Sequence, residues 1–144
     1  MRSGEINTSM PHYVVAKTIE ALNENRKSLK GSKVLVLGLA YKKDIDDLRE
    51  SPSIELIELL REKGAKVDYN DPYIPKTHKQ RRHDLQMASK KLSAKMLTGY
   101  DVIIISTDHS DYDYEWIVKN SKLIVDTRNA TAAVRGVGKK VIKA

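Results

Sequence analysis

Apolar residues along this chain form two kinds of pattern, short unbroken runs and longer stretches in which they recur with a helical period. Unbroken runs rich in valine, leucine and isoleucine are typical of strands buried on both faces of a parallel sheet. We expect such strands at residues 33–37, 66–70, 101–106, 123–126 and 140–142. The periodic stretches predict helices at residues 9–25, 52–63, 93–97 and 114–120.

The first predicted helix shows its apolar face clearly. Ser9-Met10-Pro11 has the composition of a helix start, and Val15, Ile19 and Leu22 then recur at i, i+4 and i+7. Beyond it, strands alternate with helices, and right-handed crossovers then give parallel strands with helices on both faces. The predicted fold class is therefore α/β, a Rossmann-like, doubly wound and mostly parallel sheet preceded by an N-terminal helix.

Composition narrows the classes of protein to which the chain can belong. It has 26 Lys and Arg against 19 Asp and Glu, a net charge of +7 that favours anionic partners. The absence of cysteine excludes disulfides, thiolate metal sites and a cysteine nucleophile, and we predict no metal site. No apolar run approaches the roughly 18 residues of a membrane span, and residues 1–9 lack the apolar centre of a signal peptide. We expect a cytoplasmic protein with no membrane partner.

The most informative segment follows the first predicted strand. It reads Gly38-Leu39-Ala40-Tyr41-Lys42-Lys43-Asp44 and continues to Asp47-Leu48-Arg49-Glu50-Ser51-Pro52, where Ser51 is a suitable N-cap and Pro52 a suitable first helical residue. Lysine and arginine pair with phosphate through charge-assisted hydrogen bonds, and the amides of a helix start point toward the same place. The segment therefore predicts an anion site, with pyrophosphate as its natural ligand.

Two other segments follow strands in the same way, at residues 107–109 and 127–129. In an open parallel sheet, ligands bind at the carboxyl ends of the strands near a topological switch point. If neighbouring strands carry these segments, Lys42, Arg49, His109 and Arg128 converge on one crevice.

These blocks resemble the C-terminal, UDP-binding domain of the UDP-glucose/GDP-mannose dehydrogenase family, which includes UDP-N-acetylmannosamine and UDP-N-acetylglucosamine 6-dehydrogenases. The resemblance rests on residues 7–15, 30–75 and 107–129. It implies UDP-sugar binding by a domain of an NAD-dependent enzyme whose full-length form oxidises the hexose C6 alcohol to a carboxylate.

The resemblance implies roles for four residues. Tyr41, Lys42 and Arg128 match positions that contact the UDP-sugar, although many members have phenylalanine where this chain has Tyr41. Arg49 matches an arginine that reaches across the domain crevice toward the pyrophosphate of NAD. The simpler alternatives are a solvated turn lysine, an arginine paired with neighbouring carboxylates at position 49, and a surface arginine at position 128.

The resemblance also implies what this chain does not do alone. Members of the family pass through an aldehyde that a cysteine thiolate captures, and this chain has no cysteine. We expect residues 1–29 to be a remnant of the central-domain helix and residues 30–144 to be the UDP-sugar-binding domain, with the N-terminal and central dehydrogenase domains as missing partners. We therefore predict no catalytic residue, no tightly bound NAD, and no oxidation by this chain unaided.

Three residues near the predicted crevice have other interpretations. His109 is the best candidate for a titrating group, but a lone histidine after a strand is more often structural, and we do not assign it a catalytic role. One interpretation of Asp71 is that it binds a ribose hydroxyl, as the acidic residue of a dinucleotide fold does. The simpler interpretation is that Asp71-Pro72 forms a turn. Gly38 lacks the two further glycines of the dinucleotide fingerprint, so NAD binding in that mode is not expected.

Two other classes of function stay open. The basic segment 76–95 and a pI of about 9.5 suit a nucleic-acid-binding module. That segment has no Phe, Tyr or Trp for base stacking, so we predict no nucleic-acid partner. A structural or oligomerisation module is the other class, because exposure of Val15, Ile19 and Leu22 would drive formation of a homodimer.

Overall fold

The structure is a computed structural model that describes residues 3–40, 52–77 and 86–144. Five strands form one sheet in the order β2-β1-β3-β4-β5, and every pairing is parallel. The strands are β1 (Lys33–Leu37), β2 (Lys66–Asn70), β3 (Val102–Ile105), β4 (Ile124–Asp126) and β5 (Val141–Lys143). The predicted Rossmann-like α/β class is confirmed.

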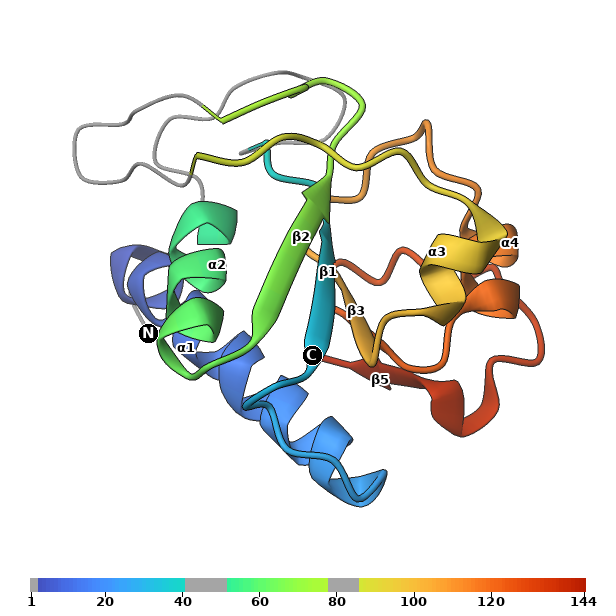
Figure 1. Cartoon of the computed structure of the whole chain (residues 1–144), viewed down its shortest axis with the longest axis horizontal. Helices are drawn as coiled ribbons and strands as arrows, with labels where there is room; N and C mark the ends of the chain where they lie inside the picture. Colours follow the sequence, from blue (N-terminus) through green and yellow to red (C-terminus); the bar gives the residue numbers. More distant parts are fainter. Residues whose placement is uncertain (1–2, 41–51, 78–85) are drawn as a thin grey trace.

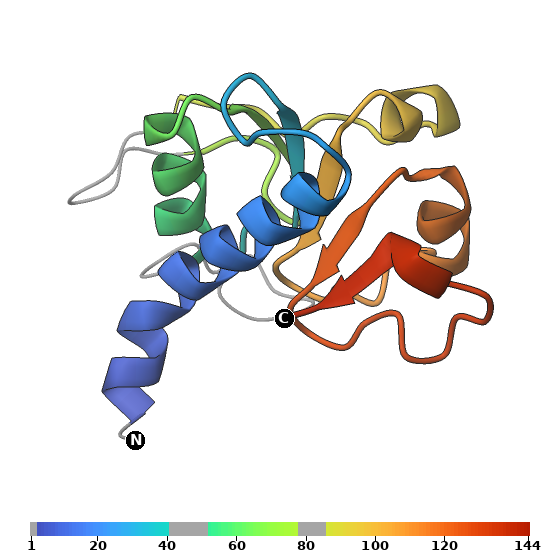
Figure 2. The same ribbon diagram turned by 90° about the horizontal axis from the view of Figure 1, so that it is seen from below.

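Helices cover both faces of the sheet. The first pair, α1 (Ser3–Glu24) and α2 (Pro52–Glu62), lies on one face, and α3 (Ala94–Thr98) and α4 (Tyr114–Asn120) lie on the other, as Figure 1 shows. A short 3-10 helix, η1 (Gly138–Lys140), precedes β5. Turned by 90°, the molecule shows α1 crossing it obliquely, with the N-terminal end of this helix extending beyond the other elements (Figure 2).

Strand side chains alternate between two hydrophobic clusters, because successive residues of a strand point to opposite faces of the sheet. Val34 and Val36 of β1 pack in the cluster that includes α1 and α2. Leu35 and Leu37 pack in the cluster that includes α3 and α4. All four side chains are fully buried, which explains why β1 is an unbroken apolar run in the sequence.

Most predicted boundaries agree with the structure to within one residue at either end, but the start of α1 does not. This helix begins at Ser3, six residues before the predicted start, and Pro11 lies inside it. Proline removes one backbone hydrogen bond from a helix interior. Here the turns that follow are held by packing, since Val14 and Val15 are buried in the core. The reading of Ser9-Met10-Pro11 as the helix start is therefore wrong.

The exposed face of α1 also differs from the prediction. Val15 and Leu22 are 3% and 0% exposed and belong to the core, whereas Ile19 and Tyr13 are 40% and 46% exposed. The expectation that Val15 and Leu22 are free to drive self-association is wrong, because α1 packs them against α2 and the sheet. Ile19 is exposed as expected, and the homodimer stays a prediction.

The chain order places a topological switch point between β1 and β3. The crossover through α2 takes the chain from β1 to β2 on one side, and the next crossover brings it back to β3 on the other side of β1. Leu37 pairs with Asn70 and with Ile105, so the carboxyl ends of these three strands are level. The loops that follow β1 and β3 therefore leave the sheet side by side.

The described residues contain neither a membrane-spanning helix nor a cluster of metal-ligating side chains. Across residues 3–40, 52–77 and 86–144, no helix combines the length and apolarity that a bilayer span requires. Over the same ranges, no three His, Asp or Glu side chains gather as the ligands of a metal ion.

Candidate functional site

The loops after β1 and β3 are in direct contact at the switch point. Gly38 has φ +89°, and a Cβ at this position would lie 2.5 Å from Cβ of Thr107. The hydroxyl of Thr107 donates to the carbonyl oxygen of Ala40 at 2.7 Å, and the N–H of Gly38 donates to the carbonyl oxygen of Asn70 at 2.8 Å. Only glycine combines this φ with so close an approach, so its place at the end of β1 is required by the geometry.

Arg128 brings a cation to the same edge from the end of β4. Its Nε donates to the carbonyl oxygen of Ser106, in the loop after β3, at 3.0 Å. Its backbone N–H donates to Oδ1 of Asp126 at 3.0 Å. The side chain is exposed, and no contact within the described residues occupies its two terminal nitrogens. Arg128 is thus oriented by one nitrogen and presents the other two to solvent.

Asp126 organises the loop that carries Arg128. Its carboxylate is 1% exposed and accepts the N–H groups of Arg128 and Ala130 on Oδ1 and that of Thr131 on Oδ2. Burial alone would raise the pKa of this carboxyl, but the hydrogen bonds from the side chain and backbone of Thr131 and from the other two amides outweigh it and lower the pKa. The loop is therefore built on an ionised carboxylate. The signal that sequence reasoning missed is an aspartate that ends a strand and is followed by polar residues.

The first turn of α2 lies against the same loop. Oγ of Ser53 is 2.5 Å from Oγ of Ser106, and Ser53 is buried. Ser106 thus contacts the start of α2 through its hydroxyl and Arg128 through its carbonyl oxygen. Segments after β1, β3 and β4 and the beginning of α2 meet at the carboxyl edge of the sheet, as predicted for the loops.

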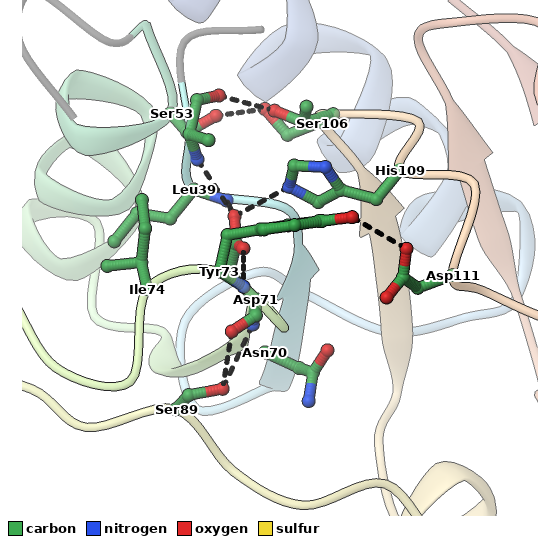
Figure 3. A network of polar contacts seen from close by, with 12 residues as sticks. Leu39, Ser53, Asn70, Asp71, Tyr73, Ile74, Ser89, Ser106, His109 and Asp111 are labelled. Atoms are coloured by element: carbon green, nitrogen blue, oxygen red, sulfur yellow. Dashed lines mark hydrogen bonds and ion pairs between the residues drawn. The ribbon is translucent and has the colours of Figure 1, made fainter. Parts of the chain in front are cut away.

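Asp71 and His109 form a buried pair beneath these loops (Figure 3). Nε2 of His109 lies 2.8 Å from Oδ2 of Asp71, and the histidine is fully buried. The ring of Tyr73 packs on the imidazole with centroids 4.8 Å apart, and its hydroxyl donates to Asp111. His109 is therefore a buried residue in contact with Asp71 that does not face the crevice, in agreement with its structural interpretation. Asp71 points into the protein, so its carboxylate is not available to a ribose hydroxyl.

The other predicted site residues are placed only by the sequence. Tyr41, Lys42 and Arg49 lie outside the described residues, in the segment that joins the β1 loop to α2. The structure describes the two ends of this segment, at Ala40 and Pro52, and both lie at the carboxyl edge of the sheet.

A separate hollow of about 750 Å³ lies at the opposite edge of the sheet, where the strands begin. Its lining includes exposed lysines at the starts of β1 and β2, Lys33 and Lys66, and the side chain of Tyr100. The hydroxyl of Tyr100 donates to Asp68 at 2.7 Å. This hollow shares no residue with the loops around Gly38, Ser106 and Arg128.

Comparison with known proteins agrees with this geometry. Residues 35–133 match the UDP binding domain of the UDP-glucose/GDP-mannose dehydrogenase family. The chain belongs to that family. The matched range includes Tyr41, Lys42, Arg49 and Arg128. The resemblance seen in the sequence is therefore confirmed, and the chain is a UDP-binding domain of the kind found in UDP-sugar dehydrogenases.

Relatives within the family are much longer than this chain. It is 33% identical to a UDP-N-acetyl-D-mannosamine dehydrogenase of Pyrococcus horikoshii over 86% of its own length and 28% of that protein. It is also 33% identical to a UDP-glucose 6-dehydrogenase of Rickettsia bellii, over 88% of this chain and 30% of the relative. The chain thus spans less than a third of the length of these relatives.

A solved structure supports the same assignment. The NDP-N-acetyl-D-galactosaminuronic acid dehydrogenase of Methanosarcina mazei superposes with a TM-score of 0.76 at 28% identity. The superposition covers 97% of this chain and 30% of the M. mazei protein. Helix α1 is therefore included in the shared structure along with the sheet.

Proposed function

We propose that the carboxyl edge of the sheet binds the diphosphate of a UDP-sugar, with Arg128 and Lys42 as the principal cations and Tyr41 as a further contact to the sugar-nucleotide. The observation that carries the proposal is the position of Arg128 at the switch-point edge. Its Nε is held by Ser106, the side chain is exposed, and no contact within the described residues occupies its two terminal nitrogens. A guanidinium fixed in this way is suited to phosphate, because two parallel N–H groups match two phosphate oxygens.

The number of charged contacts sets the expected strength of binding. Two or three charge-assisted hydrogen bonds contribute roughly 1.5 to 3 kcal/mol each, and association costs a large part of that gain. At most about 5 kcal/mol of that gain remains, which corresponds to a dissociation constant of about 0.2 mM or weaker for UDP.

The relatives that match this chain are much longer than it is. We propose that residues 30–144 bind the sugar-nucleotide and that residues 1–29 connect this unit to the remainder of a longer NAD-dependent dehydrogenase. Arg49 is assigned to NAD across the crevice between domains. Oxidation of the hexose belongs to that larger assembly, because covalent capture of an aldehyde by a thiolate needs a cysteine that this chain does not have.

We assign recognition of the UDP moiety, and not of the hexose, to this domain. Relatives named for N-acetylmannosamine and for glucose match the chain at the same identity of 33%. A shared domain that accompanies different sugars is expected to recognise the part that those substrates have in common.

Isothermal titration of the chain with UDP tests the proposal. The double variant Lys42→Ala with Arg128→Ala is expected to abolish measurable binding. The matched control is Lys33→Ala with Lys66→Ala, which also removes two positive charges, but from exposed sites at the opposite edge of the sheet. This control is expected to bind UDP as the wild type does. Undiminished binding in the first double variant, or equal losses in both, would reject the site.

A further inference from the structure

Two backbone amides at the end of β1 are occupied by a carboxylate of the same chain. The N–H groups of Leu39 and Ala40 donate to Oδ2 of Asp71 at 2.7 and 2.9 Å. Nε2 of His109 lies 2.8 Å from the same oxygen, and the N–H of Tyr73 donates to Oδ1 at 2.7 Å. Asp71 is only 2% exposed. A single buried oxygen thus meets three donors from the loops after β1 and β3 (Figure 3).

Amides in this position have another partner in dinucleotide-binding folds. There the loop after the first strand directs its N–H groups at the pyrophosphate of the ligand. A carboxylate oxygen is an anionic acceptor, as a phosphate oxygen is, and both form short hydrogen bonds with amides. In this chain the anion comes from the end of β2 instead of from a ligand.

We propose that Asp71 is a built-in substitute for a ligand phosphate. It occupies the amides of Leu39 and Ala40, fixes the loop after β1 to the loop after β3 through His109, and leaves the diphosphate of a ligand to side-chain cations. This inference rests on the proposed function for the identity of the ligand. It also gives a physical reason for the domain not to bind NAD in the fingerprint mode, because the amides which that mode requires are already taken.

Asp71 acts as a positioning residue for the proposed site at the carboxyl edge. Ala40, whose N–H it holds, accepts the hydroxyl of Thr107 through its carbonyl oxygen. Thr107 follows Ser106 directly, and the carbonyl oxygen of Ser106 orients Arg128. Loss of the carboxylate therefore displaces the loop on which Arg128 depends, without removing any group that touches the ligand.

Amide hydrogen exchange tests the anion-site part of the proposal in three variants. Asp71→Ala removes the carboxylate, Asp71→Asn keeps one acceptor oxygen, and Leu22→Ala removes a buried side chain of α1 as a control for lost stability. We expect the amides of Leu39 and Ala40 to exchange about tenfold faster in Asp71→Ala than in the control, with Asp71→Asn between them. Formate, a small carboxylate, is expected to restore protection in Asp71→Ala alone. Protection equal to that of the control, or exchange that formate leaves unchanged, overturns this part.

Calorimetry with UDP tests the positioning part. Asp71→Ala is expected to bind about tenfold more weakly than wild type, whereas Leu22→Ala, measured where it is folded, binds as the wild type does. Equal dissociation constants in these two variants would show that Asp71 serves stability alone. Failure of the wild type itself to bind UDP counts against the proposed function, and the formate experiment then still decides whether Asp71 fills an anion site.

Discussion

Replacement of Gly38 by alanine tests the contact between the loops after β1 and β3. The residue has φ +89°, and the added Cβ would lie 2.5 Å from Cβ, 2.6 Å from the carbonyl oxygen and 2.7 Å from the nitrogen of Thr107. Two of these three atoms belong to the backbone, so the clash cannot be relieved by a change of rotamer. Thr107 is further fixed, because its hydroxyl donates to Ala40.

The cost of this substitution has two parts. A left-handed conformation costs an alanine about 1 to 2 kcal/mol, and overpacking of a filled site costs about 1 to 3 kcal/mol. Their sum is a loss of about 2 to 5 kcal/mol in the free energy of unfolding. With an m-value of about 2 kcal/mol/M, the midpoint of urea unfolding falls by about 1 to 2.5 M.

Gly31 provides a matched control. It has nearly the same φ, +85°, and no atom lies within 4 Å of the position of an added Cβ. Gly31→Ala therefore carries the conformational cost without the clash, and both variants gain equally from the stiffer unfolded chain. The difference between the two midpoints isolates the packing of the two loops. If Gly38→Ala unfolds at the same urea concentration as Gly31→Ala, the close contact with Thr107 is not a feature of the protein.

Two further predictions concern pH and are measured by urea unfolding. Because the pKa of Asp126 is lowered, its contribution to folding stability is present above the ordinary pKa of 3.8 and is lost as the pH falls below it. Asp126→Asn should therefore be about 1 to 3 kcal/mol less stable than wild type at neutral pH, and this gap should close in acid. Burial, assisted by the charge of Asp71, raises the pKa of Tyr69 from 10.0 to about 12. Its contribution to folding stability is therefore complete below pH 10 and is lost as the pH rises through the folded-state value. Between about pH 8 and about pH 11, the free energy of unfolding of wild type should fall by about 1.4 kcal/mol more than that of Tyr69→Phe. A constant difference between wild type and variant across either range would contradict the corresponding assignment.

The strands were predictable because the signal for each is local. The run at residues 33–37 is apolar at four successive positions, and burial on both faces of a parallel sheet requires this pattern. The parallel arrangement of the strands, with helices on both faces, followed from their alternation with helices and from the handedness of crossovers, whereas their order in the sheet comes from the structure. The carboxyl edge could therefore be identified as the place where the loops around Gly38, Ser106 and Arg128 meet.

The extent and the faces of α1 were less predictable, since tertiary packing decides them. A proline can lie at the start of a helix or inside one, and only the burial of the turns that follow Pro11 shows which applies here. Val15, Ile19 and Leu22 share a helical period, yet Ile19 is 40% exposed and the other two are buried. A period identifies an apolar stripe, whereas the partner that covers each residue depends on distant segments such as α2.

The role of Asp71 lay beyond sequence reasoning for a related reason. Its partners Leu39 and Ala40 are 32 and 31 residues away along the chain, and His109 is 38 residues away. An aspartate before a proline has a sufficient local explanation as the beginning of a turn. Only the adjacency of β2 and β1, with their carboxyl ends level, brings its carboxylate to the amides of the next loop.

Asp71 and Asp126 both hold the backbone of loops at the carboxyl edge of the sheet. Each is a buried carboxylate at the end of a strand, and each accepts N–H groups from a loop that begins at this edge. The loop amides are thereby committed to internal anions and hold the loops in one conformation. The proposed site therefore offers an external anion exposed side-chain cations, among which the structure describes Arg128. We therefore expect affinity for the sugar-nucleotide to depend on a few individual residues, because side-chain cations can be replaced one at a time whereas backbone amides cannot.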